Sequence, residues 1–289
     1  MFIIKYKSIF ISLSIALVIA SGLLMNTYGI KRGIDFTGGS VIDIAYEKDV
    51  PVLSAEAFKV SDISLYKTGE NTYRFISSKT YEEISPVINS LGNVENKTPF
   101  QFTQVSTVGS TLGAEMTKKA IIALVVVVLA ILSFIAFAFR EVSLPVSSWK
   151  YGVIAMVTLI HDIIVPTGVY VILSHKYGAE VDTLFVIALL TIIGISISDK
   201  IVVFDRIREN LKVSKGTFDE IVGKSLSQTF TRSINTSVTV VLALIALYVA
   251  GPAATKYFTL TLMIGMVVGT YSSIFVASPL LTVWNKSKK

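Results

Sequence analysis

Six long stretches with few or no charged residues divide this chain and limit what it can fold into. They are Ile9–Met25, Ala120–Phe139, Tyr151–Leu173, Thr183–Phe204, Ser233–Thr255 and Tyr257–Trp284. Each reaches or approaches the roughly 20 residues that an α-helix needs to cross the hydrocarbon of a bilayer. Only 16% of the 289 residues are charged, whereas soluble domains carry about a quarter. The pattern predicts an α-helical integral membrane protein with six transmembrane helices.

The long stretch between the first two spans, residues 27–118, predicts a small folded domain outside the membrane. Its strand-like and helix-like runs follow the order β-α-β-β-α-β, which is the ferredoxin-like order of an α+β domain. The strand-like runs are Ser40–Tyr46, Asp62–Tyr66, Thr72–Ser77 and Phe100–Val105, and the helix-like runs lie near Ser54–Lys59 and Tyr81–Leu91. We therefore expect helix 1 within residues 1–26, this domain next, and helices 2–6 within residues 119–289.

Basic residues gather on one side of the predicted spans. Residues 205–231, expected to form a loop, contain Arg206, Arg208, Lys212, Lys215 and Lys224. The loops after spans three and five contain one lysine each, Lys176 and Lys256. Because basic residues collect on the cytoplasmic side, both termini and the 205–231 loop are expected in the cytoplasm. The 27–118 domain is then expected on the exported, periplasmic side.

Composition excludes several classes of function. The chain has no cysteine and only two histidines, His161 and His175, so disulfides, thiol chemistry and Cys/His metal sites are not expected. We expect no cofactor and, without a nucleophile–base arrangement or a phosphate-binding glycine loop, no enzymatic activity. The net charge of +6 does not predict nucleic-acid binding, because no basic patch with interleaved aromatic residues accompanies it.

Ionisable side chains inside the spans form the candidate site. His161 and Asp162 lie in span three, Asp199 and Lys200 in span four, and Arg232 at the start of span five. Such groups are costly in hydrocarbon and are functional candidates for that reason. If spans four and five are antiparallel, Asp199 and Arg232 lie at similar depth and can pair. Burial disfavours the charge of an aspartate and an arginine favours it, so this pair predicts proton transfer, with a static ion pair as the alternative.

Lys200 lies about 100° round the helix from Asp199. We therefore expect it to extend to the membrane surface or to pair with another group. His161 and Asp162 are equally compatible with proton handling and with ordinary hydrogen bonding between helices.

Several motifs occur in order along the chain. They are GIDFTGGS (Gly33–Ser40), VGSTLGAEMTKKAI (Val108–Ile121), LIHD in span three, VVFDRIREN (Val202–Asn210) and GTYSSIFVASPLL (Gly269–Leu281). In these motifs the chain resembles the SecF family, the smaller subunits of the SecD–SecF complex of bacterial protein secretion. The motif positions that carry the likeness most clearly are Gly33, Asp35, Phe36, Gly38, Gly39, Asp205, Arg206, Arg208 and Glu209. From its residues alone, the charged end of span four reads as a solvated helix end or a docking surface.

The resemblance implies a fold related to the resistance–nodulation–division transporters, with SecD as the partner that completes the assembly. It implies a bacterial inner-membrane protein that uses the proton-motive force to assist polypeptide export through SecYEG, with YajC and YidC as associates. Asp199 and Arg232 match the residues that the family associates with proton passage. Ser198 and Lys200 stand where the family commonly has Asn and Thr.

Two other functions stay open. One is a proton-coupled small-molecule transporter of the same broad fold, although such pumps would be expected to carry much larger exported domains. The other is a non-transporting membrane assembly factor in which the buried charges only fix helix packing.

Overall fold

The computed structural model describes residues 2–47, 63–94, 100–138 and 148–286. The chain divides into two compact units. One, the helical unit, consists of Met1–Gly29, Ala123–Tyr170 and Leu184–Lys289, and the other, the sheet unit, of Ile30–Ile122 and Val171–Thr183. The sheet unit therefore combines residues 30–122 with the connection between the third and fourth spans.

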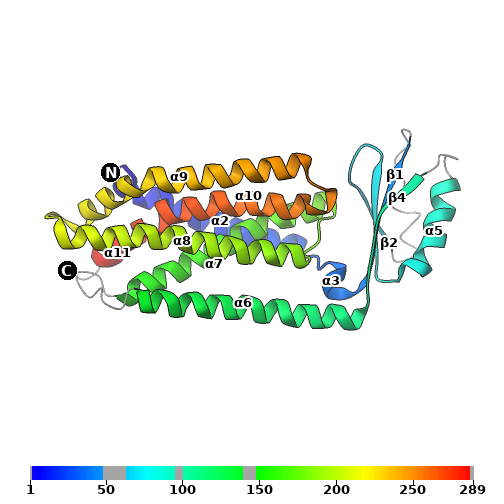
Figure 1. Ribbon diagram of the computed structural model, residues 1–289, viewed down its shortest axis with the longest axis horizontal. Coiled ribbons are helices and arrows are strands. Elements are labelled where there is room, and N and C mark those ends of the chain that lie inside the picture. Colours follow the sequence, from blue (N-terminus) through cyan, green and yellow to red (C-terminus); the bar gives the residue numbers. More distant parts are fainter. Residues whose placement is uncertain (1, 48–62, 95–99, 139–147, 287–289) are drawn as a thin grey trace. The chain divides into compact units, whose positions relative to one another are not determined.

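Six helices in the described part of the chain are long and apolar enough to cross a membrane, which confirms the number of spans expected from the sequence. Within the helical unit they run alongside one another (Figure 1). The first five are α2 (Lys7–Tyr28), α6 (Ser110–Ala138), α7 (Ser148–Tyr177), α8 (Thr183–Val213) and α9 (Phe218–Ala250). The sixth comprises α10 (Lys256–Ser272), the π-helical turn η2 (Ser273–Ala277) and α11 (Ser278–Lys286). A short α1 (Phe2–Lys5) precedes α2, and a 3₁₀ turn η1 (Ala253–Thr255) precedes α10.

Helix α8 contributes many residues to the apolar core of the helical unit. Its buried apolar side chains, among them Ile193, Ile197 and Phe204, pack in one cluster with residues of α1, α6, α7, α9, η2 and α11. Helix α10 approaches α8 closely at Gly269, where an added side-chain carbon would lie 3.2 Å from Cβ of Ser196. Small residues allow this approach between membrane helices, and it brings the polar residues of α8 next to those of α10.

The stretch 205–231, expected as a loop, is helical except for the four-residue turn 214–217. Helix α8 continues to Val213, and α9 begins at Phe218. The start of α9 is stabilised by a capping box, in which Thr217 Oγ1 accepts from the Glu220 amide and Glu220 Oε2 accepts from the Thr217 amide. The sequence-based expectation was wrong because charged residues on one face concealed buried apolar residues on the other, such as Ile207 and Val222.

The sheet unit contains four antiparallel strands in the order β2-β3-β1-β4. They are β1 (Gly39–Tyr46), β2 (Ile63–Lys67), β3 (Thr72–Ser77) and β4 (Phe100–Val108), and α5 (Tyr81–Val94) follows β3. Ile84 and Ile88 of α5 pack with Ile42, Ile44 and Phe75 of the sheet. All four predicted strands and the second predicted helix are present, with small shifts at their ends. The helix expected near Ser54–Lys59 lies outside the described residues.

The glycine-rich motif before β1 fastens the α7–α8 connection to this unit. Gly33 donates its amide to the carbonyl of Val181 at 2.8 Å, and Oδ2 of Asp35 accepts from the amide of Thr183 at 2.9 Å. The second bond places a carboxylate at the start of α8, where free amides favour negative charge. The short helix α3 (Ile34–Thr37) then ends at two glycines with positive φ, Gly38 at 77° and Gly39 at 118°.

Gly39 is the motif position with least room for a side chain, because an added Cβ would overlap the carbonyl oxygen of Ser77. We predict that Gly39→Ala destabilises the protein by about 1–3 kcal/mol, the cost of a residue held in such a conformation. The thermal unfolding midpoint of purified protein in detergent measures this effect. Gly22→Ala is the matched control, because no atom lies within 4 Å of its added carbon. Equal midpoints for the two variants would contradict the conclusion that Gly39 has no room for a side chain.

Glu180 is a titratable group in the α7–α8 connection, outside the membrane spans. Burial raises the pKa of Glu180 from 4.5 to about 7; Arg74 and Lys31 oppose this rise, while Asp182 and Asp35 add to it. The folded unit therefore favours the protonated carboxyl group. Its contribution to stability is complete below pH 4.5 and is lost as the pH rises through 7.

We expect Glu180→Gln to remove this pH dependence, since an amide imitates the protonated acid and does not ionise. Between about pH 5 and pH 8 the unfolding midpoint of the unmodified chain should fall further than that of the variant. Glu82→Gln, at an exposed position of α5, should behave like the unmodified chain. A Glu180→Gln profile parallel to that of the unmodified chain would count against the assignment.

Candidate functional site

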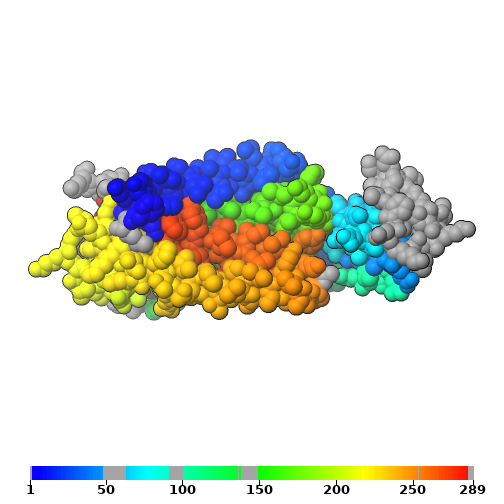
Figure 2. Space-filling model, turned by 90° about the horizontal axis from the view of Figure 1, so that it is seen from above, coloured from blue at the N-terminus to red at the C-terminus, as the bar shows by residue number. Residues whose placement is uncertain are grey.

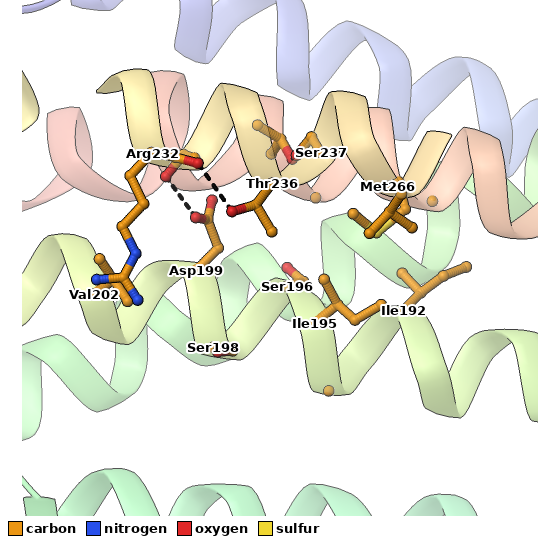
Figure 3. Close-up of a pocket in the computed structure, with 16 residues that line it drawn as sticks. Ile192, Ile195, Ser196, Ser198, Asp199, Val202, Arg232, Thr236, Ser237 and Met266 are labelled. Carbon is orange, nitrogen blue, oxygen red and sulfur yellow. Dashed lines mark hydrogen bonds between the residues drawn. The ribbon is translucent and has the colours of Figure 1, made fainter. Parts of the chain in front are cut away.

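Helices α8, α9 and α10 enclose a cavity of about 350 Å³ beside Asp199. Its lining is rich in hydroxyl groups, with Asp199 as the acidic residue and Arg232 as the basic one (Figure 3). The hydroxyl-bearing residues are Ser196, Ser198, Ser233, Thr236, Ser237 and Thr270. The cavity therefore places an ionisable group among hydrogen-bonding partners within a membrane-spanning part of the chain.

The two carboxylate oxygens of Asp199 have different surroundings. Oδ1 accepts a hydrogen bond from Ser233 Oγ of α9 at 2.5 Å. Oδ2 is buried and has no hydrogen-bond partner among the described residues. A buried anionic oxygen without a donor is costly, and protonation of that oxygen removes the cost. The geometry is therefore suited to binding a proton at Oδ2.

Arg232 lines the same cavity, but the expected ion pair with Asp199 is not formed in the described part of the chain. Its side chain is exposed and extends towards Val202 (Figure 3). Arg232 and Ser233 are successive residues of one helix and therefore face about 100° apart. Because Ser233 is the residue that faces Asp199, Arg232 is turned away from it.

A second cavity, of about 320 Å³, begins where the first ends. Both are lined by Val202 and Arg232, and the second also contains Asp205, Arg206 and Glu209 near the charged end of α8. Arg232 therefore stands between the surroundings of Asp199 and the polar end of the helix.

Asp162 occupies a second polar cluster, on the other side of α8. Its Oδ2 accepts from Lys200 Nζ and Ser196 Oγ, each at 2.5 Å, and from Ser272 Oγ at 2.8 Å. Its Oδ1 lies 2.9 Å from Nδ1 of His161. The Asp162 side chain is 0% exposed and that of Lys200 1% exposed. Three helices, α7, α8 and α10, thus meet at one carboxylate.

Lys200 was expected from the sequence either to reach the membrane surface or to pair with another group, and its partner was not identified. It does not extend to the membrane surface but pairs elsewhere, with Asp162. The signal that could have found it is the spacing of Ser196 and Lys200, four residues apart on one face of α8. A serine and a lysine on one face of a membrane helix indicate a buried acceptor opposite them, and Asp162 was the acidic candidate on the preceding helix.

The two acidic residues are therefore suited to different tasks. Asp162 has donors at both oxygens and a cation in contact, so its charge is compensated where it lies. Asp199 has a donor at Oδ1, and its Oδ2 has none among the described residues. From the sequence, Asp199 was the candidate for proton transfer, and Asp162 was equally compatible with proton handling and with hydrogen bonding between helices.

The charged motif at the end of α8 joins that helix to the start of α9. Arg206 Nε donates to Gln228 Oε1 at 2.8 Å, and Arg206 Nη1 lies 2.5 Å from Glu209 Oε2. Asn210 donates to Ser225 and Gln228 at 2.8 and 2.7 Å. These bonds give the motif an intrachain role that neither of the two sequence-based interpretations contained. Asp205 and Glu209 stay exposed, and Nη1 of Arg208 lies 3.9 Å from Asp205.

We predict that Lys200→Met destabilises the protein by about 3–5 kcal/mol, because it leaves the charge of Asp162 buried without its cation. The double variant Asp162→Asn/Lys200→Met should recover much of the loss, since no unpaired charge remains. Denaturation in detergent compares the two. If the double variant were less stable than Lys200→Met, the pair would not be the compensated unit described here.

Comparison with known proteins agrees with the motifs and the fold. The model of the C-terminal part of the protein export membrane proteins SecD/SecF matches residues 88–287, and the SecD/SecF GG motif model matches residues 24–50. The chain is 41% identical to the protein translocase subunit SecF of Thermobaculum terrenum, over 98% of this chain and 93% of that protein. It is 34% identical to that of Anaerolinea thermophila, over 99% and 94%.

The fold also matches a solved structure. The crystal structure of SecDF, a translocon-associated membrane protein from Thermus thermophilus, superposes with a TM-score of 0.84 and 29% identity. The match covers 98% of this chain and 38% of that longer chain. The family match over most of the residues, together with relatives of closely similar length, settles the classification: the chain belongs to the SecD/SecF family of protein export membrane proteins.

Proposed function

We propose that this chain is a SecF-type subunit that uses the proton-motive force to assist polypeptide export, with Asp199 as the group that binds and releases the proton. The observation that carries the proposal is the buried Oδ2 of Asp199, which has no donor among the described residues although its partner oxygen is hydrogen-bonded. The names of the SecF relatives support the export role.

The proton enters the cavity beside Asp199 and neutralises its carboxylate at Oδ2. Release leaves an anion, which attracts the nearest cation of the cavity, Arg232. Because the Arg232 side chain has cavities on both sides, it can turn between Val202 and Asp199. Protonation of Asp199 thereby controls whether the arginine blocks or opens the route to the charged end of α8.

The energy available is sufficient for such a switch. Moving one charge through a membrane potential of about 100 mV supplies ~2.3 kcal/mol. A free-energy difference of this size changes the ratio of two conformations by a factor of roughly 50. In this proposal, that bias favours one arrangement of α8 and α9 over the other.

The exposed face of α9 supports a second protein as partner. Arg232, Asn235, Thr236 and Thr239 are all exposed on this helix. Only 6% of the most apolar stretch of α9 is buried, against 50% of the corresponding stretch of α8. Helix α9 forms an outer edge of the helical unit (Figure 2, yellow to orange). Arginine and asparagine are unfavourable in hydrocarbon, so another protein must cover them. We assign that role to SecD, in agreement with the greater length of the SecDF chain.

The remaining parts of the proposal follow from charge and family. Basic residues around the α8–α9 turn favour a cytoplasmic location for that turn and for both termini. The sheet unit, taken as a ferredoxin-like domain, then lies on the exported side of a bacterial inner membrane in this proposal. There the sheet unit meets the emerging polypeptide. SecYEG supplies the channel, and YajC and YidC are the expected associates.

We predict that Asp199→Asn abolishes the part of export that depends on the proton gradient, while co-purification with SecD is retained. The asparagine keeps the size and the acceptor for Ser233 but does not titrate. Export into membrane vesicles, with and without an ionophore, measures this loss.

Thr191→Val is the control for this experiment. It removes a polar group from the same helix at an exposed position outside the cavity lining, where Thr191 Oγ1 bonds only its own helix. Gradient-dependent export should persist in it. Undiminished export in Asp199→Asn, or in a variant that neutralises Asp199 and Arg232 together, would favour a scaffold function.

A further inference from the structure

The charged pair Asp162–Lys200 lies next to the proposed proton site without belonging to it. Lys200 directly follows Asp199 in α8, so the two side chains leave the helix about 100° apart. Lys200 is held on the side of α7 and α10 by Asp162, whose Oδ2 also accepts from Ser272. Asp199 is directed to the other side, towards Ser233 of α9.

We propose that Lys200 is a positioning residue for Asp199: its bond to Asp162 fixes the rotation of α8 about its axis and so aims Asp199 into the cavity. The inference rests on the proposed function of Asp199 and adds a cause for its orientation. The bond is a deep anchor, because separating two fully buried charges is far more costly than breaking a bond at the surface.

Ser196 makes the coupling between the two sides short. It lines the cavity of Asp199, and its hydroxyl group donates to Asp162 and accepts from Lys200 at 2.5 Å. Gly269 of α10 packs directly on it. A rotation of α8 that released Lys200 would therefore also displace the cavity wall, one turn from Asp199.

The charges that surround Asp199 come from a small number of elements. Arg232 of α9 lines the cavity, and Lys200 lies on α8, as Asp199 does. Asp162 and His161 lie on α7, where Asp162 accepts from Ser196. The cavity residues that α10 contributes, Gly265, Met266, Gly269 and Thr270, carry no charge. A variant that removes the charges of Asp162 and Lys200 together leaves the net charge near Asp199 unchanged. It therefore tests the orientation of the Asp199 side chain separately from the effect of nearby charge on that side chain.

The test uses dicyclohexylcarbodiimide, which modifies protonated carboxyl groups in apolar surroundings, on the full chain purified with SecD. Peptide mass spectrometry follows modification of Asp199 against pH. Asp162→Asn/Lys200→Met removes both charge and bond. Asp162→Asn/Lys200→Gln removes the same charges but keeps a hydrogen bond between α7 and α8.

We expect the methionine variant to change the rate of Asp199 modification by about tenfold or more, because misplacement of about 1 Å has effects of this order or larger. The glutamine variant should stay close to the unmodified protein. Lys7→Met/Asp219→Asn, which neutralises another interhelical pair, should also leave the profile unchanged. The proposal would be overturned if Asp199 were modified in both Asp162/Lys200 variants at the same rates as in the original protein, or if the rates changed equally in both.

Should the methionine variant not fold, Ser272→Ala takes its place. This substitution removes the donor that α10 supplies to Asp162, and Ser272 does not line the cavity of Asp199. A smaller change in the same direction is expected, and an unchanged profile contradicts the inference. Labelling reports the orientation of Asp199 whether or not export depends on it, so failure of this inference is distinguishable from failure of the proposed function.

Discussion

A single carboxylate–ammonium bond, between Asp162 and Lys200, is the interaction on which the arrangement of the helical unit depends. Both charges are removed from solvent, and each is compensated by the other and by serine hydroxyl groups from two helices. Such a pair contributes little net stability compared with apolar packing, but it is costly to break, so it specifies geometry. The bond joins α7 to α8, and Ser272 of α10 donates to the same carboxylate. On its other face α8 presents Asp199 to Ser233 of α9.

The proposed function rests on the contrast between this carboxylate, which has donors at both oxygens, and Asp199, whose Oδ2 has no donor among the described residues. Asp199 shares a helix with Lys200 but faces a cavity lined by hydroxyl groups and by Arg232. Its neighbours on α9 bind it by one hydrogen bond, from Ser233. A membrane protein that moves protons needs a group whose protonation changes a weak contact, held in place by contacts that do not change. The two clusters supply these two parts within one turn of α8.

Sequence patterns were sufficient for the features that depend on local chemistry. Apolar runs predicted the six spans, strand-like runs predicted the four strands, and charge in hydrocarbon made Asp162, Asp199 and Arg232 the candidates. Features that depend on packing between distant segments were not predictable. The partner of Lys200 is set by the rotation of α8, and attachment of residues 171–183 to the sheet unit uses backbone bonds from Gly33. The helical start of α9 was missed because its surface charge resembled a loop.

The central claim, that Asp199 exchanges a proton while Asp162 stays ionised, is tested most directly by infrared difference spectroscopy of the purified complex between acid and alkaline pH. A protonated carboxylic acid in a dry site has a carbonyl stretch that is absent from the ionised form. Because Glu180 is a second buried acid with a raised pKa, the comparison is made in a Glu180→Gln background. There we predict that the pH-dependent band of a buried acid disappears in Asp199→Asn and persists in Asp162→Asn/Lys200→Gln. Survival of that band in Asp199→Asn, or its loss in the Asp162 variant alone, would contradict the account.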